Sequence, residues 1–424
     1  MNTMPSVTES DKVDQETKSN ITRVAALVSI ATVLQISESL IPHPVPGVRL
    51  GLANMITLVA LVEMGFGAAM EISILRCVLS SFVLGTFLTP TFILSVSGAL
   101  LSTIFMWVFY RLSSRLSKYG FSLIGISIIG AVIHNISQLA LAYYLLIKHP
   151  SIFYFLPLLM ISSIVMGLLT GLVAAQVLWQ LKYAVGSIGK NNIPVPDTDK
   201  LVDFSSQSGA RISFLHRLAP QWKIFITIIF SVLVLFLTNW WGYLALGVTL
   251  GGLMLLTKVP GTAYISTLSR FRRLSSFIII SFTFPVLFSY GNNVLVSLGP
   301  LKITEQGLAT GGLFALRIIF LIWLTFLLNL FTTPEEMTTG IGKLLAPFRV
   351  FGLRSHRIAA VLSLSWNTLP SVWNRTRAAI RNNKTVDNTE NRPGILTKIR
   401  RINLSLSNLI TSLYRQGEEI SDVK

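Results

Sequence analysis

The sequence predicts an all-α protein that crosses a membrane several times. Of its 424 residues, 52% are hydrophobic and only 12% are charged, whereas soluble domains carry about 25% charged residues. Several stretches of roughly 18 residues contain few or no charges, which is typical of membrane-spanning helices. The single cysteine, Cys77, lies in an apolar stretch. It excludes a disulfide framework and a cysteine-based metal site.

Ten apolar segments define the predicted spans. Six of them lie near residues 24–42, 50–65, 69–88, 92–110, 121–147 and 153–181. Four more lie near residues 224–239, 241–257, 276–292 and 307–331. The stretch between the two groups contains NNIPVPDTDK and SSQSGAR, a composition that is typical of a linker because it cannot bury a core.

This pattern predicts five regions along the chain. Residues 1–22 are polar and are expected to form a disordered cytoplasmic tail, followed by a six-span membrane domain over residues 23–182. A linker over residues 183–222 leads into a four-span membrane domain over residues 223–331. Residues 332–424 contain no segment that is apolar enough to cross a bilayer, so we expect cytoplasmic helices and a basic tail there.

Basic residues fall mainly on one side of this ten-span arrangement. That side receives Arg23, Arg111, Arg115, Lys118, Lys182, Lys190, Lys258, Arg270, Arg272 and Arg273. The other side receives Arg49, Lys148 and Lys302. Because loops rich in Lys and Arg stay in the cytoplasm, the bias predicts a multi-pass inner-membrane protein with both termini cytoplasmic. The net charge of +17 therefore indicates topology and a surface for membrane lipids, and no nucleic-acid partner is expected.

Polar side chains inside or beside the first six spans form the candidate substrate site. Such groups are costly at membrane depth and usually face a cavity or a partner helix. The candidates are Glu38, Arg49, Asn54, His134, Asn135 and Gln138. Arg49 lies in the rigid, proline-rich segment PHPVPGVRLGLAN, and a guanidinium there could grip a carboxylate or phosphate.

Each candidate also has a structural interpretation. His134, Asn135 and Gln138 could provide hydrogen bonds between helices, and Arg49 could be an ordinary solvated loop residue. Glu38 and Arg76 could form an ion pair or lie on the pocket wall, and for Arg76 we favour a structural role. We expect one ligand-accessible cavity near the outer face, lined by Arg49, Asn54, His134 and Gln138.

Three segments in the first half carry a family resemblance. PGVRLGLAN, GTFLTPTFILSVSGAL and GAVIHNISQLA, in this order on six spans, resemble the Gx transporter family, also labelled heptaprenyl diphosphate synthase component I. That family resembles the substrate-binding S components of energy-coupling factor transporters, and the resemblance covers about residues 21–182. Prenyl elongation needs aspartate-rich magnesium sites, and the sequence has no Asp-Asp pair. We therefore expect neither an independent synthase nor catalytic residues.

A helix start is predicted where the last span ends. Thr333, Pro334 and Glu336 follow the pattern of an N-cap, an N1 proline and a capping-box acid. Met337, Ile341, Leu344 and Leu345 then recur at helical spacing, as expected for an amphipathic helix in the membrane interface. From Lys343 to Arg415 the chain has 13 basic and two acidic residues.

This C-terminal region also resembles a known family. TTPEEMTTGIGKLLAPFRVFGL, followed by LSLSWNTLP and a basic helix, is similar to the T component of energy-coupling factor transporters over about residues 215–415. Arg317 matches a family arginine. In that family a cytoplasmic helical pair docks on two ATPase subunits, and the first docking motif corresponds here to Ala379–Asn382. The resemblance implies partner coupling through Thr333, Pro334, Glu336, Arg377, Arg381 and Arg415.

Taken as a whole, the sequence predicts an S-component-like domain of six helices joined to a T-component-like domain of four spans with cytoplasmic coupling helices. It has no G-x-x-x-x-G-K-[ST] segment, so ATP would act through separate ATPase chains, and no cofactor or metal is expected on this chain. The expected function is import of a small vitamin-like or precursor molecule. Two alternatives stay open: a membrane accessory component of isoprenoid or quinone biosynthesis, and a secondary transporter.

Overall fold

The computed structural model describes most of the membrane-embedded chain. It covers residues 9–40, 51–116, 120–147, 150–183, 218–256, 278–279, 281–288, 293–298, 301–347 and 355–387, with the single residues 275, 407, 408 and 411. Apart from one two-stranded hairpin, the described regular structure is helical. Six of the described helices are long and apolar enough to cross a membrane. The protein is therefore a helical, polytopic membrane protein, as predicted.

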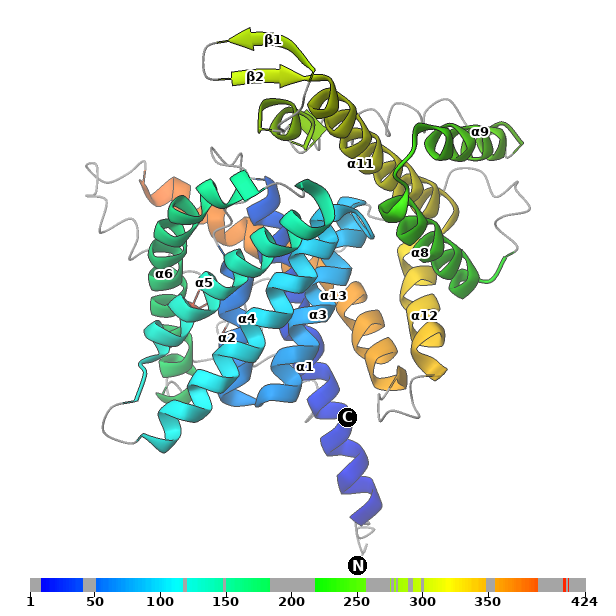
Figure 1. Ribbon diagram of the computed structural model, residues 1–424. Helices are drawn as coiled ribbons and strands as arrows, with labels where there is room; N and C mark the ends of the chain where they lie inside the picture. Colours follow the sequence, from blue (N-terminus) through cyan, green and yellow to red (C-terminus); the bar gives the residue numbers. More distant parts are fainter. Residues whose placement is uncertain are drawn as a thin grey trace, which may run out of the picture.

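Six α-helices build the first half of the chain. They are α1 (Glu9–Leu40), α2 (Leu52–Glu63), α3 (Phe66–Leu84), α4 (Pro90–Arg115), α5 (Leu123–Ala142) and α6 (Leu156–Tyr183). Between α5 and α6 lie a π-helical turn, η1 (Tyr143–Ile147), and a 3-10 segment, η2 (Pro150–Phe155). Figure 1 shows these helices gathered into one bundle.

Two sequence predictions for this bundle need correction. The tail predicted as disordered up to residue 22 is helical from Glu9 onward, because residues 9–22 contain no Pro or Gly and include good helix formers. The second predicted span is only the 12-residue helix α2, about 18 Å long and too short for a core of about 30 Å. Gly51 and Gly65, with φ of 73° and 84°, limit α2 because other residues rarely adopt this backbone conformation.

The second half begins with the apolar helices α8 (Pro220–Phe236) and α9 (Trp240–Leu256). Part of the next predicted span is described, and residues 281–288 are helical. An antiparallel hairpin of β1 (Val294–Leu298) and β2 (Leu301–Thr304) then leads into the long helix α11 (Glu305–Phe331). The hairpin was not among the elements predicted from the sequence. Residues 184–217, the centre of the predicted linker, lie outside the described part of the chain.

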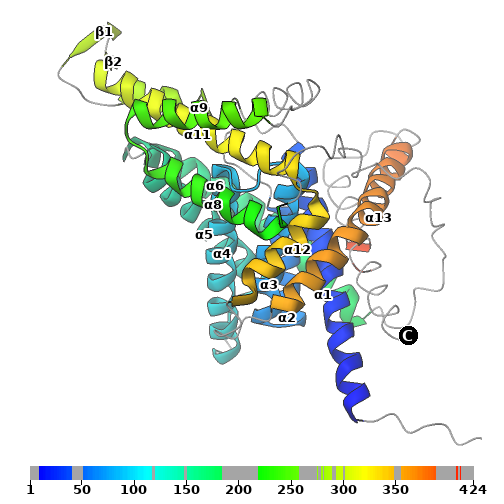
Figure 2. The ribbon, with the colours of Figure 1, turned by 90° about the vertical axis from the view of Figure 1, so that its right-hand side faces the viewer.

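Two further helices follow the last apolar helix. They are α12 (Pro334–Leu345) and α13 (Ser355–Asp387). In Figure 1 the hairpin and α9 stand beyond one end of the six-helix bundle, while α12 and α13 run beside it. Figure 2 shows the same offset after rotation, with α13 next to α1 and α12 next to α13.

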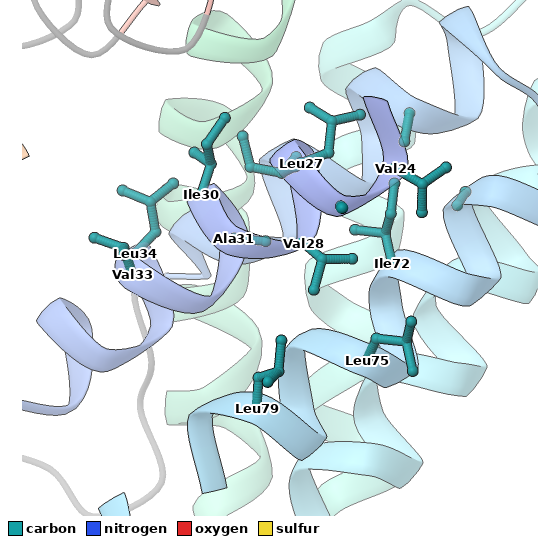
Figure 3. Close-up of a cluster of buried hydrophobic side chains, with 14 of the residues drawn as sticks. Val24, Leu27, Val28, Ile30, Ala31, Val33, Leu34, Ile72, Leu75 and Leu79 are labelled. Carbon is teal, nitrogen blue, oxygen red and sulfur yellow. The ribbon is translucent and has the colours of Figure 1, made fainter. Parts of the chain in front are cut away.

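The largest hydrophobic core contains residues from both halves of the chain. Its centre is the buried face of α1 against α3, where Leu27 and Leu79 are fully buried (Figure 3). The same cluster includes Met337 of α12 and Val361 and Leu362 of α13. Met337 was expected to face a membrane interface, but it is 1% exposed and packs inside the protein. The two halves thus share one core.

Candidate functional site

A buried polar cluster lies where α1, α2 and α3 meet. Arg76 is its centre: Nη1 donates to Oε1 of Gln35 at 2.8 Å, and Nη2 donates to Oδ1 of Asn54 at 2.6 Å. Beside it, Oε1 of Glu38 accepts a hydrogen bond of 2.8 Å from the backbone N–H of Gly51. Arg76 and Glu38 are both 4% exposed. We call these five residues the Arg76 cluster.

The Arg76 cluster contains two of the predicted site residues, Glu38 and Asn54. Arg49, which precedes Gly51 by two residues in the sequence, lies outside the described part of the chain. Arg76 was interpreted as structural, and Gln35 was not singled out by sequence reasoning. The signal for both was a polar side chain inside an apolar segment, which is costly unless it is paired.

A second polar cluster lies between α4, α5 and α6. His134 Nε2 is 3.0 Å from Nε2 of Gln138, one helical turn further along α5. The imidazole packs directly on Gly98 of α4, where a methyl group would lie 2.7 Å from its Cε1 atom. Asn135 Nδ2 donates a hydrogen bond of 2.7 Å to Oγ of Ser163 on α6. We call these residues the His134 cluster.

Close helix packing holds the His134 cluster in place. Gly167 and Gly171 of α6 face the backbone of α5, where a methyl group would lie 2.6 Å from Cα of Ile128 and 2.9 Å from Cα of Ile124, respectively. Ser127 Oγ and Thr170 Oγ1 add a buried hydrogen bond of 3.0 Å. Small residues of this kind let membrane helices approach closely. Asn135 therefore has the helix-joining contact that was one of its two sequence interpretations.

The candidate substrate residues that the structure describes fall into these two clusters, on different sets of three helices. Asn54 is held by Arg76, whereas His134 and Gln138 lie against α4. Both clusters offer hydrogen-bonding groups inside an apolar bundle, and the Arg76 cluster adds charged ones; a small polar molecule could be recognised at such places. A single cavity that joins them stays a prediction. Among the described residues, no three His, Cys, Asp or Glu side chains gather as metal ligands.

Helix α13 is held against α1 of the first half by hydroxyl groups. Ser29 Oγ lies 2.7 Å from Oγ1 of Thr368 and donates to the carbonyl of Ser365 at 3.0 Å. In return, Ser365 Oγ donates to the carbonyl of Ala25 at 3.1 Å. Ser29 and Ser365 are both 0% exposed. Reciprocal hydrogen bonds of this type fix the register of two helices because they can form in only one alignment.

Two polar contacts flank this hydroxyl contact. At the start of α13, Arg357 Nη2 forms a salt bridge of 3.1 Å with Oε2 of Glu71 on α3. From the last apolar helix, Thr325 Oγ1 donates a hydrogen bond of 2.5 Å to the carbonyl of Phe87, in the turn between α3 and α4. The first half is therefore held by both α13 and α11.

The helix start predicted at Thr333 is confirmed. Thr333 Oγ1 accepts from the N–H of Glu336 at 3.2 Å, and Oε2 of Glu336 accepts from the N–H of Thr333 at 3.1 Å. Pro334 occupies the first turn, so the full capping box is present. Nearby, Lys223 Nζ donates a hydrogen bond of 2.8 Å to the carbonyl of Phe331. This bond connects the start of α8 to the end of α11.

The basic candidates for partner coupling lie on or beyond α13. Arg377 is exposed on α13, where it could contact another chain. Arg381 belongs to the same helix, and Arg415 lies outside the described residues. Gln180 of α6 contacts the described end of the chain, with its Oε1 accepting from Ser407 Oγ at 2.7 Å.

Comparison with known families gives a match for each half of the chain. Residues 27–177 match the family described as heptaprenyl diphosphate synthase component I, and residues 212–422 match the family described as cobalt transport protein. The chain joins a region of each family. Its C-terminal half is related to the T components of energy-coupling factor transporters, as the resemblance predicted.

Individual relatives support the assignment of the C-terminal half. The energy-coupling factor transporter transmembrane protein EcfT of Listeria innocua is 37% identical over 172 residues, which are 41% of this chain and 64% of the relative. EcfT of Bacillus subtilis is 28% identical over 211 residues, 49% of this chain and 78% of the relative. The chain thus spans slightly less than two thirds of the Listeria protein.

Proposed function

We propose that this chain forms the membrane part of an energy-coupling factor type importer. In this proposal the first domain, residues 23–182, binds a small vitamin-like or precursor molecule. The second domain, residues 223–331, and the helices that follow it over residues 332–424 couple it to separate ATPase chains. The relation of the second half to T components supports the coupling role.

The observation that carries the proposal is the contact between Thr325 and Phe87. Charge bias predicts that Phe87 lies in an outer turn, whereas Thr325 lies six residues before Phe331, the cytoplasmic end of α11. Six helical residues correspond to about 9 Å. The two groups nevertheless share a hydrogen bond of 2.5 Å. With this topology, in which the short helix α2 still returns the chain to the cytoplasmic side, the first domain is tilted or displaced toward the cytoplasm by a large part of the roughly 30 Å core.

The α1–α13 contact supports the same displacement. Ser29 lies near the middle of the apolar segment Ser19–Ser39, yet it packs against Ser365 on a helix that follows the membrane exit of α11. A domain that carries its ligand inward must reach such a position during its cycle. ATP binding by the partners would then return it outward, because a ligand shifts an equilibrium through its different affinities for the two states.

The site residues keep their proposed roles within this cycle. Glu38, Arg49, Asn54, His134, Asn135 and Gln138 are proposed to recognise the substrate, and Arg76 joins them because it holds Asn54. An anionic substrate would suit Arg49. Alanine at Arg49 and His134 is expected to reduce the amount of ligand retained by the purified protein. Normal retention by both variants would assign these residues to helix packing.

The experiment that tests the proposal is affinity purification of the full chain from its native membranes. ATPase chains should co-purify with the wild type, and Arg381→Glu should remove them if Arg381 inserts into a groove of the ATPase. Lys384→Glu, the same charge change one turn along α13, is the matched control. A diffuse electrostatic contact would lose about 1 kcal/mol from either change. Equal loss in both variants would leave the segment as a membrane-surface anchor.

One alternative has a specific observation in its favour. The match of residues 27–177 to heptaprenyl diphosphate synthase component I suggests a membrane accessory subunit of isoprenoid or quinone biosynthesis. In that case a soluble prenyl synthase, and no ATPase, would co-purify. A chain that captures neither would favour a secondary transporter.

A further inference from the structure

Arg317 is a buried cation that contacts both halves of the chain. It lies within α11 and is 4% exposed. Its Nη1 donates a hydrogen bond of 3.1 Å to the carbonyl of Leu145, in the first half. Its Nη2 donates another of 3.1 Å to the carbonyl of Leu237, in the second half. One guanidinium therefore joins the two halves.

Both acceptors lie at the C-terminal ends of helices. Leu237 is the C-cap of α8, and Leu145 belongs to the π-helical turn that continues α5. Carbonyl groups at such ends lack partners within their own helix, and they form the negative pole of the helix dipole. A planar guanidinium can donate to both at once. The ring of Phe314, 5.2 Å from Cζ of Arg317, adds a cation–π contact.

Apolar side chains also meet beside this contact. They are Pro90, Ile93, Leu94, Leu145 and Leu235, and they come from both halves. Further along the interface, α1 and α13 meet through fully buried side chains, including Val361 and Leu362. Arg317 therefore adds a polar contact between the halves to these apolar ones.

We propose that Arg317 is a positioning residue that holds the first domain against α8 and α11 in the conformation described here. This inference rests on the proposed import cycle, in which the first domain moves relative to the second. When Leu145 moves away, the guanidinium loses one of its two carbonyl acceptors while it stays in an apolar environment. The α1–α13 contact then acts as the pivot, and the Arg317 contact is the one that opens.

Distance measurement between spin labels in the full chain tests this role without ATPase or substrate. In a Cys77→Ser background, labels replace Tyr154 and Trp241, which are 80% and 78% exposed on the first and second halves. In lipid nanodiscs the wild type should give mainly one distance. Arg317→Met, which keeps an unbranched chain without charge or donors, should add a longer distance. The ratio of open to closed protein should rise about tenfold or more.

Three further variants make the result specific. Arg317→Lys keeps the charge but has no planar fork, so it should open less than Arg317→Met. Ser371→Ala removes an exposed hydroxyl group of α13 that bonds within its own helix, and it should leave the distances unchanged. If Arg317→Met does not fold, Arg317→Gln takes its place and should add the same longer distance. A folded, uncharged variant with wild-type distances overturns the proposal, whether or not ATPase chains bind.

Discussion

Substitution of Ser29 by leucine tests whether the hydroxyl contact between α1 and α13 holds the two halves together. Ser29 is 0% exposed and lies within 3.0 Å of groups on two residues of α13. Forcing a larger side chain into such a contact typically costs about 1–3 kcal/mol. Loss of the hydrogen bond to Ser365 adds about 1 kcal/mol. The expected total of about 2–4 kcal/mol corresponds to at least a roughly 30-fold weaker association of the halves.

The assay uses the full chain with a specific protease site inserted between residues 184 and 217. After cleavage, a tag on the N-terminal half should retain the C-terminal half in the wild type. Ser29→Leu should release it, whereas Ser39→Leu, the same change at an exposed position of α1, should not. Equal retention of the C-terminal half by all three proteins would refute the proposed role of this contact.

Three other changes have defined outcomes. Glu71→Arg or Arg357→Glu should each weaken retention of the C-terminal half in the cleavage assay. The double reversal should restore retention because the salt bridge of 3.1 Å can form again. Failure of the double variant to restore it would show that this salt bridge does not hold the halves together. Gly167→Ala should lower the melting temperature, since its methyl group would lie 2.6 Å from Cα of Ile128 and overpacking costs about 1–3 kcal/mol. Gly251→Ala, with no atom within 4 Å, should not lower it; a similar decrease in both would contradict the packing argument. Thr333→Ala should cost about 1 kcal/mol and speed amide hydrogen exchange at the start of α12, and unchanged exchange would show that the cap contributes little.

Local features of this protein could be predicted from its sequence. The capping box at Thr333 and Glu336 depends on residues three positions apart, so its pattern can be read directly. The apolar segments that form α1, α3, α4, α5, α6 and α11 were visible for the same reason. The short length of α2 could not be read from hydropathy, because it is set by the backbone conformation of Gly51 and Gly65.

Contacts between distant residues could not be predicted in this way. Arg76 reaches Gln35 and Asn54, which are 41 and 22 residues away in the sequence. The hydrogen bond from Thr325 to Phe87 spans 238 residues. Such contacts depend on how helices pack, and hydropathy does not encode the relative depth of two membrane domains. Sequence reasoning therefore named Asn54 and His134 as candidates but could not place them in separate clusters.

In the proposed importer, one chain carries both substrate binding and coupling to separate ATPases. Its most direct test is uptake by proteoliposomes that contain the full chain and its co-purified ATPase chains. The probe is the small molecule that mass spectrometry identifies in the purified protein. Accumulation should require ATP and should be lost in the Ser29→Leu variant. Uptake that continues without ATP, or a chain that accumulates nothing but stimulates a co-purified prenyl synthase, would contradict the claim.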